Sequence, residues 1–476
     1  MYKNFFILIC LASPIYAADS KPNSDDAEMD LIMQGFEDST STKEDDFSDI
    51  IQGFEDTTPN TTPMEEQVSI TPESPWDIKT LLSLSASYNY QHTTPTNNET
   101  DYRGLSRLKL KLQPELRYRF SPNWDSLISA NAFYDFAYTI NDRDNYTSQV
   151  LDSYESEVEL REVYLRGTIT SNLDLTLGRQ IVVWGKADSV RVVDVINPLD
   201  FREPGMVDIE DLRLPSLMAK ADLYLSNWNI SAIVIPEIRM NKNPAYGSDF
   251  YLGDPAAPEP DEEIPDDFRN LEFALALHGQ FQGWDLSFHS AYLFDDQAYI
   301  QVINNKPVLK HARIALAGFA GNVALGSWLL KTEYALLKGI RFTNFNNTYN
   351  RSDAMLGIDY SGITDNTLSI ETVARYIHDY DESLNELPND TEEIEGQVFF
   401  RYTGNFLREK LQVTALISLL GFSTDDGAFY RGSLKYELME AMSLEVGGIV
   451  YQHGDSRISQ IAANNDRVFM DLRYSF

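Results

Sequence analysis

The fold is decided by a stretch of fourteen residues from Arg107 to Phe120, RLKLKLQPELRYRF. Apolar side chains occupy alternate positions of this stretch: Leu108, Leu110, Leu112, Leu116, Tyr118 and Phe120. Polar and largely basic side chains stand between them: Arg107, Lys109, Lys111, Gln113, Glu115, Arg117 and Arg119. Successive side chains of a β-strand point to opposite faces, so the pattern predicts a strand with one apolar and one charged face. Such long alternation is rare in soluble sandwiches, whereas about 9–11 tilted residues cross a bilayer, so the apolar face is expected to contact lipid.

The same alternation appears near both ends of the remaining chain. It runs from Leu82 to Tyr90 and again from Val468 to Phe476, where the chain ends on an aromatic residue. We therefore predict an all-β protein, a transmembrane antiparallel up-and-down β-barrel over residues 78–476. Its outer face is expected to contact outer-membrane lipid and lipopolysaccharide, and its last strand to engage the barrel assembly machinery through Phe476.

The first eighteen residues are typical of a cleaved secretory signal peptide. An apolar run follows Lys3, and Ala17 and Ala18 provide small residues at the cleavage site. The only cysteine, Cys10, lies inside this segment and follows Ile9, where a lipidation site needs a small residue. Neither a lipid anchor nor a disulfide is therefore expected. No later stretch approaches about 20 consecutive apolar residues, so the sequence predicts no transmembrane helix. An exported chain without such a helix can be soluble in the periplasm, secreted, or a barrel in the bacterial outer membrane. The 12% of aromatic residues and the alternating strands favour the outer membrane.

Residues 19–77 form a strongly acidic leader. They contain 17 Asp or Glu residues against two lysines, within a chain of net charge −35 that disfavours a nucleic-acid partner. The motif QGFED occurs twice, with Gly35 and Phe36 in one copy and Gly53 and Phe54 in the other. We expect a disordered periplasmic extension in which Phe36, Phe54, Gly35 and Gly53 dock a partner. The alternative is a chance duplication in a linker.

Short and long connections alternate between the predicted strands. The short ones are residues 121–123, 171–172, 226–227, 280–283, 325–327 and 440–441. The longer ones lie near residues 139–155, 186–216, 239–266, 296–308, 339–351, 379–393 and 454–463. Because outer-membrane barrels have short periplasmic turns and longer external loops, this alternation assigns the two ends of the barrel.

Tryptophan supports this assignment. Trp124, Trp228, Trp284 and Trp328 each follow one of the short turns directly, as expected of an aromatic girdle at the periplasmic interface. The strand count comes to about eighteen, or to sixteen if the weaker patterns at residues 309–321 and 394–404 are not strands. Eighteen strands enclose a lumen wide enough for water or for a plug.

If the apolar residues face lipid, their alternates line the lumen. Arg107, Lys109 and Lys111 then form a basic ladder on the wall, and Glu157, Glu159, Lys331 and Glu333 line other strands. Charged residues in a lumen are more often salt-bridge partners that hold the wall than ligands for a solute. The alternative is a transverse electric field that orients polar solutes at a constriction.

The connection at residues 186–216 is the most individual part of the chain. It brings five β-branched residues close together, from Val190 to Ile196, between charged ones. An exposed loop has no use for these apolar side chains, so we expect the segment to fold inward and narrow the pore. The alternative is an external cap on the neighbouring loops. The predicted constriction residues are Arg179, Lys186, Asp188, Arg191, Asp194 and Arg202, with Arg107, Lys109 and Lys111 on the wall.

Three motifs carry a resemblance to a known family: Leu160-Arg161-Glu162-Val163-Tyr164, Gly178-Arg179-Gln180 with Trp184-Gly185, and Ile196-Asn197-Pro198-Leu199-Asp200. The sequence resembles a family of Gram-negative outer-membrane barrels known only as a domain of unknown function. Its members resemble porins and are often associated with RND-type exporters and with the use or movement of hydrophobic compounds. The resemblance implies transport, without naming a substrate.

No pattern for catalysis stands out. The sequence contains neither an H-E-x-x-H pair nor a G-x-S-x-G elbow. His289 and Ser290 are adjacent, but adjacent residues of a strand point to opposite faces, so His289 would not activate Ser290. We predict no enzyme activity, no catalytic residue, no metal site and no cofactor.

These observations predict an outer-membrane channel or transport protein that passes a small solute or a hydrophobic compound, either passively or as the outer component of an RND-type export system. The alternative is a non-conducting binding or scaffold protein that docks a periplasmic partner through its repeated leader.

Overall fold

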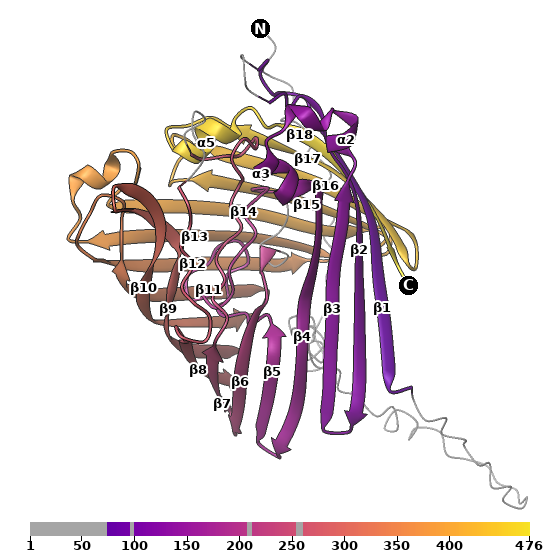
Figure 1. Cartoon of the computed structure of the whole chain (residues 1–476). Coiled ribbons are helices and arrows are strands. Elements are labelled where there is room, and N and C mark those ends of the chain that lie inside the picture. Colours follow the sequence, from indigo (N-terminus) through magenta and orange to yellow (C-terminus); the bar gives the residue numbers. More distant parts are fainter. Residues whose placement is uncertain (1–73, 96–99, 207–211, 254–259) are drawn as a thin grey trace, which may run out of the picture. The chain divides into compact units, whose positions relative to one another are not determined.

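Strands that follow one another along the chain pair side by side until the sheet closes on itself. The computed structural model describes residues 74–95, 100–206, 212–253 and 260–476, which form one antiparallel sheet of eighteen strands (Figure 1). The prediction of an up-and-down barrel with about eighteen strands is confirmed. The predicted signal peptide, and the leader residues Gly35, Phe36, Gly53 and Phe54, lie outside the described residues.

The first half of the barrel consists of β1 (Trp76–Asn89), β2 (Gly104–Ser121), β3 (Trp124–Asp135), β4 (Ser156–Thr170), β5 (Leu173–Gln180), β6 (Ser216–Leu225), β7 (Trp228–Ile235), β8 (Glu272–Phe281) and β9 (Trp284–Ile303). The second half consists of β10 (Lys306–Leu325), β11 (Trp328–Ile340), β12 (Tyr349–Ile363), β13 (Asn366–His378), β14 (Ile394–Phe406), β15 (Leu411–Leu420), β16 (Ala428–Met439), β17 (Met442–Gln452) and β18 (Arg467–Ser475). The first strand therefore begins two residues before the predicted start of the barrel.

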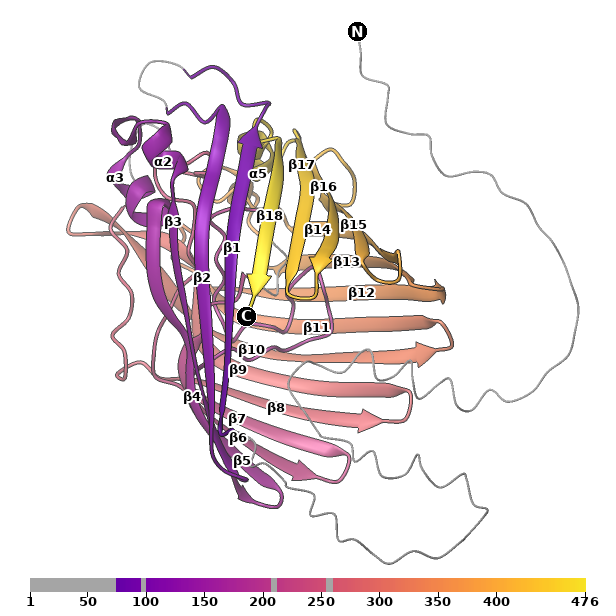
Figure 2. The same ribbon diagram turned by 90° about the vertical axis from the view of Figure 1, so that its right-hand side faces the viewer.

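The first and last strands close the barrel. Leu82 on β1 is opposite Tyr474 on β18, and Ala86 is opposite Met470, in a regular antiparallel ladder. Figure 2 shows β1 and β18 side by side at this seam. Closure matters because a sheet edge within a bilayer would leave backbone N–H and C=O groups without partners.

The connections at one end of the barrel are short. The turns before β3, β5, β7, β9, β11 and β17 are those predicted, and further short turns occupy residues 364–365 and 407–410. Trp124, Trp228, Trp284 and Trp328 are the first residues of β3, β7, β9 and β11, which confirms their predicted position beside these turns. In outer-membrane barrels the end with the short turns is the periplasmic one.

One predicted connection is wrong. Residues 296–308 were expected to form a longer loop, but β9 and β10 continue through this region and meet at a two-residue turn, Asn304 and Asn305. Both residues have positive φ angles, 50° and 65°, which asparagine tolerates and which a tight hairpin turn requires. Polar residues and a register shift between His311 and Arg313 interrupt the alternation here, and so the sequence pattern resembles a loop. The weaker patterns at residues 309–321 and 394–404 are the strands β10 and β14.

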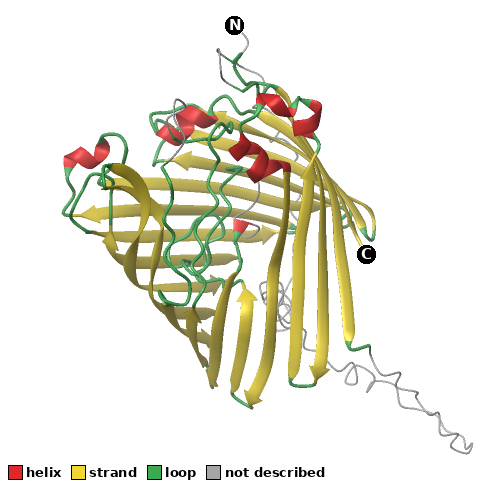
Figure 3. Cartoon of the chain, viewed as in Figure 1, coloured by secondary structure: helices red, strands yellow, loops and turns green. Residues whose placement is uncertain are grey.

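Short helices lie at the end opposite the short turns, coloured red in Figure 3. They are α2 (Ala137–Ile140), η2 (Arg143–Asn145), α3 (Ser148–Val150), η3 (Leu151–Glu155), η4 (Glu382–Asn385) and α5 (Arg457–Ala462). None of the helices in the described part of the chain is long and apolar enough to span a membrane.

The two faces of the sheet have different roles. Large apolar side chains such as Leu110, Phe288 and Leu356 are exposed on the outside, at 41%, 46% and 65% of their surface, where lipid covers them. On the inside, the largest apolar cluster joins the connection between β5 and β6 to the wall formed by β6 to β14. This connection is the part of the molecule that shapes the lumen.

Candidate pore and the loop that crosses it

The connection between β5 and β6 folds into the barrel over its described residues, 181–206 and 212–215. We call it the inward loop; its Val182, Trp184, Val190, Val192, Val193 and Ile196 belong to the buried cluster inside the wall. Facing side chains on the wall are small, and Ala276, Ala320 and Ala335 have no exposed surface. Small residues let the loop approach the strands closely and bury its β-branched side chains. The predicted inward fold of this segment is confirmed.

The base of the loop is tied together by residues of the family motifs. The Asn197 side chain accepts a hydrogen bond from the backbone N–H of Val182 at 2.8 Å and donates one to the carbonyl of Leu214 at 2.9 Å. Glu162 on β4 accepts the backbone N–H of Ile181 at 3.2 Å. Gly178 has a φ of 136°, and a Cβ there would lie 2.2 Å from the carbonyl oxygen of Val163, so a side chain does not fit. These motif residues hold the two ends of the loop at the wall.

Arg191 and Asp194 stabilise the loop internally. The Arg191 guanidinium donates to the carbonyl of Asn197 at 2.8 Å, and Asp194 accepts both the backbone N–H of Trp184 at 3.2 Å and the guanidinium of Arg213 at 2.9 Å. Asp194 is 3% exposed and is therefore a buried, fully paired carboxylate. Both predicted constriction residues serve the shape of the loop in this structure.

Glu333 on β11 receives the tip of the loop. Its carboxylate accepts backbone N–H groups from Lys186, from Ala187 at 2.8 Å and from Val193 at 3.2 Å. Gly185 beside it has a φ of 90°, and a Cβ there would lie 2.6 Å from a Glu333 oxygen. A buried carboxylate that accepts hydrogen bonds from several backbone N–H groups forms strong, charge-assisted interactions. The wall therefore holds the loop through its backbone.

A second carboxylate, Glu371 on β13, holds the next two residues of the loop. It accepts the backbone N–H groups of Asp188 at 2.9 Å and Ser189 at 2.8 Å. Lys331 on β11 offsets part of the negative charge here, because its ammonium pairs with Asp188, with Asp359 at 2.7 Å and with Glu371 at 3.5 Å. Glu333, Glu371 and Lys331 together form what we call the wall clamp.

The return half of the loop is held by β4. Arg202 pairs with Glu157 at 2.9 Å and with its neighbour Asp200 at 2.6 Å. Lys242, from the connection between β7 and β8, pairs with Glu159 at 3.0 Å. The acidic side chains predicted to line this strand therefore act as ion-pair partners for two different connections.

Beyond Arg202 the loop reaches the other side of the lumen. Glu203 pairs with Arg107 and, at 3.7 Å, with Lys109, both on β2. Burial raises the pKa of the Glu203 carboxyl, but the two cations outweigh it and hold the pKa well below its ordinary value. Next to this pair, Met206 packs with Ile449, Tyr451 and other residues of β16 to β18. The loop thus contacts strands on opposite sides of the barrel, and Figure 3 shows it in green within the ring of strands.

Arg179 does not lie where it was predicted. It is opposite Val163 on β4 and Leu217 on β6, and directly opposed residues share a face of the sheet. Leu177, two residues earlier on the same face, is 42% exposed on the outside. Arg179 is therefore on the outer face, where it pairs with Glu237, and it is not a pore residue.

The side chains of two predicted residues lie inside the barrel and take no part in the ion pairs of the clamp. Lys186, at the tip of the loop, pairs with Asp285 on β9 at 2.8 Å. Lys111 lies on β2 opposite Ser83, on the same face as Arg107 and Lys109, and is partly exposed. The structure therefore joins Arg107, Lys109 and Arg202 along one side of the loop, and Lys186 and Asp188 at its tip.

The lumen wall opposite β8 and β9 is polar. From β15 through β18 to β2, partly exposed polar side chains alternate with the outward apolar ones: Gln412, Thr414, Ser433, Lys435, Glu445, Asp471, Ser85, Lys111, Gln113 and Glu115. We call this region the polar wall. It offers mixed charge and hydroxyl groups to water, with Arg431 and Arg473 3.8 and 3.9 Å from Glu445.

Sequence reasoning assigned no role to Glu371 and Asp359, the wall residues that bind the loop tip and Lys331. A signal for both exists in the sequence: each acidic residue stands at an inward position in a strand otherwise rich in apolar residues, where burial demands a partner. His289 and Ser290 do lie on opposite faces. His289 is buried, with its ring 4.6 Å from that of Trp184, while Ser290 is exposed on the outside. The predicted absence of enzyme activity stays a prediction.

The closed barrel, its outer apolar face and its girdle of tryptophans define a transmembrane β-barrel of the bacterial outer membrane. Residues 7–476 match the model of the family described as "Protein of unknown function (DUF1302)". The chain belongs to this family. No curated protein matches the sequence.

Solved structures share the architecture at low sequence identity. OccAB1 from Acinetobacter baumannii is 10% identical, with a TM-score of 0.50 over 84% of this chain and 96% of that one. OccK2 (OpdF) from Pseudomonas aeruginosa, solved in complex with glucuronate, is 12% identical, with a TM-score of 0.47 over 84% and 98%. OmpT, an outer membrane protein of Vibrio cholerae, is 11% identical, with a TM-score of 0.40 over 84% and 99%. The likeness to OccAB1 supports the fold and nothing beyond it.

Proposed function

We propose that this protein is an outer-membrane channel that passes a small solute along the polar wall. The observation that carries the proposal is the difference between the two sides of the lumen. One side is apolar and covered by the inward loop, whereas the other presents partly exposed polar and charged groups. Polar groups on a pore wall can form hydrogen bonds that replace those between a solute and water. The polar wall is therefore the favourable side of the lumen for passage of a hydrated solute.

In this proposal the inward loop is a fixed constriction. Asp194, Arg191 and Arg202 are engaged within the loop or with β4, so they shape the passage and are not its main ligands. The groups that would contact a solute are Lys111, Glu115 and Lys435 on the polar wall. A mixed set of charges favours polar or zwitterionic solutes over strongly charged ones.

A finer proposal rests on the family resemblance alone. The channel would serve as the outer component of an RND-type export system, and its cargo would include hydrophobic compounds. Chemical crosslinking in intact cells, followed by identification of the captured proteins, tests this step. Capture of an inner-membrane exporter supports it, and an unchanged crosslinking pattern after deletion of every such exporter contradicts it.

Planar bilayer recordings test conduction itself. The purified barrel is expected to give stepwise currents, and the double variant Glu333→Ala with Glu371→Ala, which releases the loop tip, is expected to give larger and longer openings. Glu115→Ala with Glu445→Ala is the matched control, because it removes two carboxylates from the polar wall and leaves the clamp intact. Silence in both the native protein and the clamp variant would contradict a channel.

One observation favours the second candidate, a non-conducting scaffold. The inward loop is anchored on β11 and β13 and again on β2, so it spans the lumen in the manner of a plug. The barrel would then only present its leader to a periplasmic partner. A pull-down with a peptide of residues 30–58 tests docking, and loss of capture after Phe36→Ala with Phe54→Ala supports it. If the variant peptide captures the same proteins as the native peptide, the leader serves only as a linker.

A further inference from the structure

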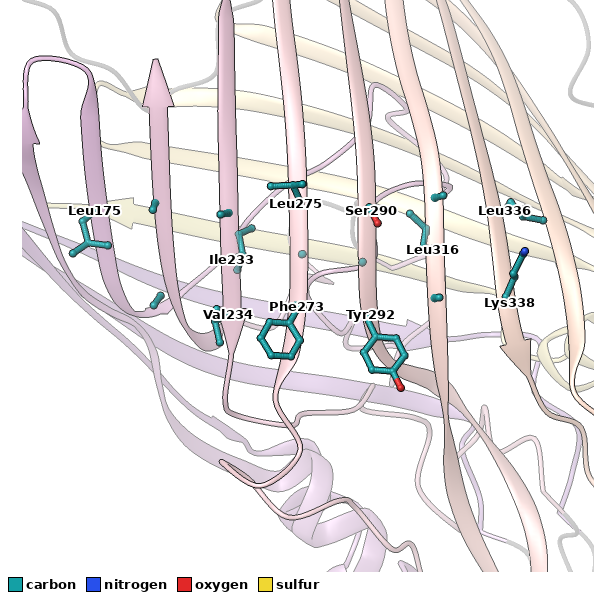
Figure 4. Close-up of a pocket in the computed structure, with 17 residues that line it drawn as sticks. Leu175, Ile233, Val234, Phe273, Leu275, Ser290, Tyr292, Leu316, Leu336 and Lys338 are labelled. Atoms are coloured by element: carbon teal, nitrogen blue, oxygen red, sulfur yellow. The ribbon is translucent and has the colours of Figure 1, made fainter. Parts of the chain in front are cut away.

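The outer face of the barrel carries a hollow of about 780 Å³ across β5 to β11 (Figure 4). It faces the membrane, because the side chains around it alternate with the buried ones of the inner wall. A depression in a surface that lipid covers must be filled by lipid, by another protein or by a side chain.

The floor of the hollow is a row of mostly small residues. Consecutive antiparallel ladders align Ala221, Ala232, Leu275, Ser290, Ala317 and Leu336 across the six strands. Figure 4 shows Leu275, Ser290 and Leu336 in this row. Alanine and serine leave space between leucines, so the row forms a shallow trough across the strands.

The trough is closed on its periplasmic side. Two residues further along each strand toward the short turns, the ladders align Leu223, Ile230, Leu277, Phe288, Phe319 and Tyr334. All six side chains are large, and they form a ridge below the small ones. On the external side, the next row holds Val234, Phe273 and Tyr292 on β7 to β9, but only Ala219 on β6 and Ala315 on β10. The hollow is therefore open toward the lipid and, at β6 and β10, toward the external end of the barrel.

Two cations stand at the open, external side of the hollow. Lys338 on β11 is opposite Ala315 on β10 and lines the hollow. Arg313, one row further out on β10, lies with its guanidinium 3.9 Å from the ring centre of Phe294 and 4.9 Å from that of Tyr292. Within the described ranges neither cation forms an ion pair or a hydrogen bond, and the Arg313 Nη1 atom is buried without an acceptor.

The depth of these cations matches a membrane boundary. Lys338 lies ten residues beyond Trp328, which marks the periplasmic interface. At about 3.3 Å per residue and a strand tilt of roughly 40°, ten residues rise about 25 Å, which is the height of the apolar band of such barrels. The two cations are thus at the level of the outer-leaflet head groups, and the small-residue trough is at the level of the acyl chains.

We propose that this hollow is a binding site for lipopolysaccharide, with an acyl chain in the trough and a phosphate group on Lys338 and Arg313. Charge complementarity selects this occupant, because the outer leaflet supplies a molecule that combines phosphates with acyl chains. The hollow offers an apolar trough with Lys338 at its edge and Arg313 one row beyond it, and neither of these cations forms an ion pair within the described ranges. The row of large residues below it fixes how deep the chain reaches. This site does not depend on whether the lumen conducts.

Lipid retained by the purified protein tests the site. Full-length protein in detergent is titrated with lipopolysaccharide and, separately, with the same lipid after enzymatic removal of its phosphates, and binding is followed by native mass spectrometry. Arg313→Gln with Lys338→Gln is expected to weaken binding of the phosphorylated lipid about thirtyfold, as two membrane-surface cations would. Binding of the dephosphorylated lipid is expected to change little. Lys306→Gln, at the exposed turn of the same strand pair, is the matched control.

A second variant separates the trough from the charges. Ala317→Trp fills the hollow without altering any charge and is expected to weaken binding of both lipids. The proposal is overturned if both variants bind phosphorylated lipid as the native protein does. It is also overturned if Ala317→Trp leaves lipid binding unchanged but dissociates an oligomer, because the hollow would then be an interface between copies of the chain.

Discussion

The two sides of the lumen wall differ in a way that the outside of the barrel does not reveal. Strands β7 to β11 present Ala274, Ala276, Ala291 and Ala335 inward, and the inward loop covers them. Strands β15 to β18, β1 and β2 present polar groups inward, and many remain partly exposed. One side of the barrel interior is therefore packed against the loop, and the other side is hydrated. Substitutions on the two sides should differ in their effects on the unfolding temperature and on the current.

The largest effect is expected from Lys331→Met in the wall clamp. The substitution removes the cation that Asp188, Asp359 and Glu371 share, and leaves three carboxylates close together without compensation. Breaking a buried ion pair from one side costs about 3–5 kcal/mol. The unfolding temperature in detergent should fall, with larger currents from a loosened loop. Adding Asp359→Asn should restore part of the lost stability, because it removes one of the uncompensated carboxylates. If Lys331→Met does not lower the unfolding temperature, the wall clamp contributes little to stability.

A bulky substitution on each wall compares the two sides directly. Ala335→Phe overfills the buried contact with the loop, which typically costs about 1–3 kcal/mol, and should lower the unfolding temperature and raise the current. Ser433→Phe on the polar wall should leave the unfolding temperature nearly unchanged and reduce the current by narrowing the path. If both variants change the current in the same direction, the two walls do not have the separate roles assigned to them.

Acid is expected to weaken the contact between the loop and β2. The pKa of Glu203 is depressed in the folded protein, so its contribution to stability is complete above the unfolded pKa of about 4.3 and is lost as the pH falls toward the folded value. The effect should be smaller than that of Ala335→Phe, because the clamp still holds the loop tip. Current fluctuations should increase below about pH 4. If acid increases the current fluctuations of the Glu203→Gln variant by the same amount, a titratable group other than Glu203 causes the increase.

The smallest effect on stability is expected from Lys111→Glu on the polar wall. A partly exposed charge reversal should change the unfolding free energy by no more than about 0.5 kcal/mol. If solutes pass along this wall, the ratio of cation to anion current should nonetheless shift toward cations, measured as the reversal potential in a salt gradient. An unchanged reversal potential would place the conducting path elsewhere.

The outer face and the short turns carry most of what the sequence predicts correctly. In β2 apolar residues alternate with polar, mostly basic ones, because one face meets lipid and the other meets water or an ion-pair partner. In β8, the run Leu275, Ala276, Leu277 is apolar on both faces, because the loop covers the inner one. Periodicity alone does not separate the inner from the outer face there.

Within the candidate site, sequence predicts the inward loop but not its anchors. The β-branched residues of the loop indicate burial by themselves, whereas Glu371 and Asp359 acquire their roles only from contacts that cross the barrel. Arg179 was misplaced because its motif suggested function while its register places it outside. The site therefore depends on pairings between distant strands, which no local pattern encodes.

The order in which this molecule assembles follows from where the anchors of the inward loop lie in the chain. Lys186 and its acceptor Glu333 are 147 residues apart, Asp188 and Glu371 are 183 apart, and the carbonyl of Pro204 accepts the hydroxyl of Tyr451, 247 residues away. Contacts this distant in sequence form slowly, because each closes a long loop of chain. The inward loop is therefore expected to lack these contacts until the sheet has nearly closed. Fluorescence of Trp184, the buried tryptophan of that segment, is then expected to reach its native value last during refolding into detergent micelles.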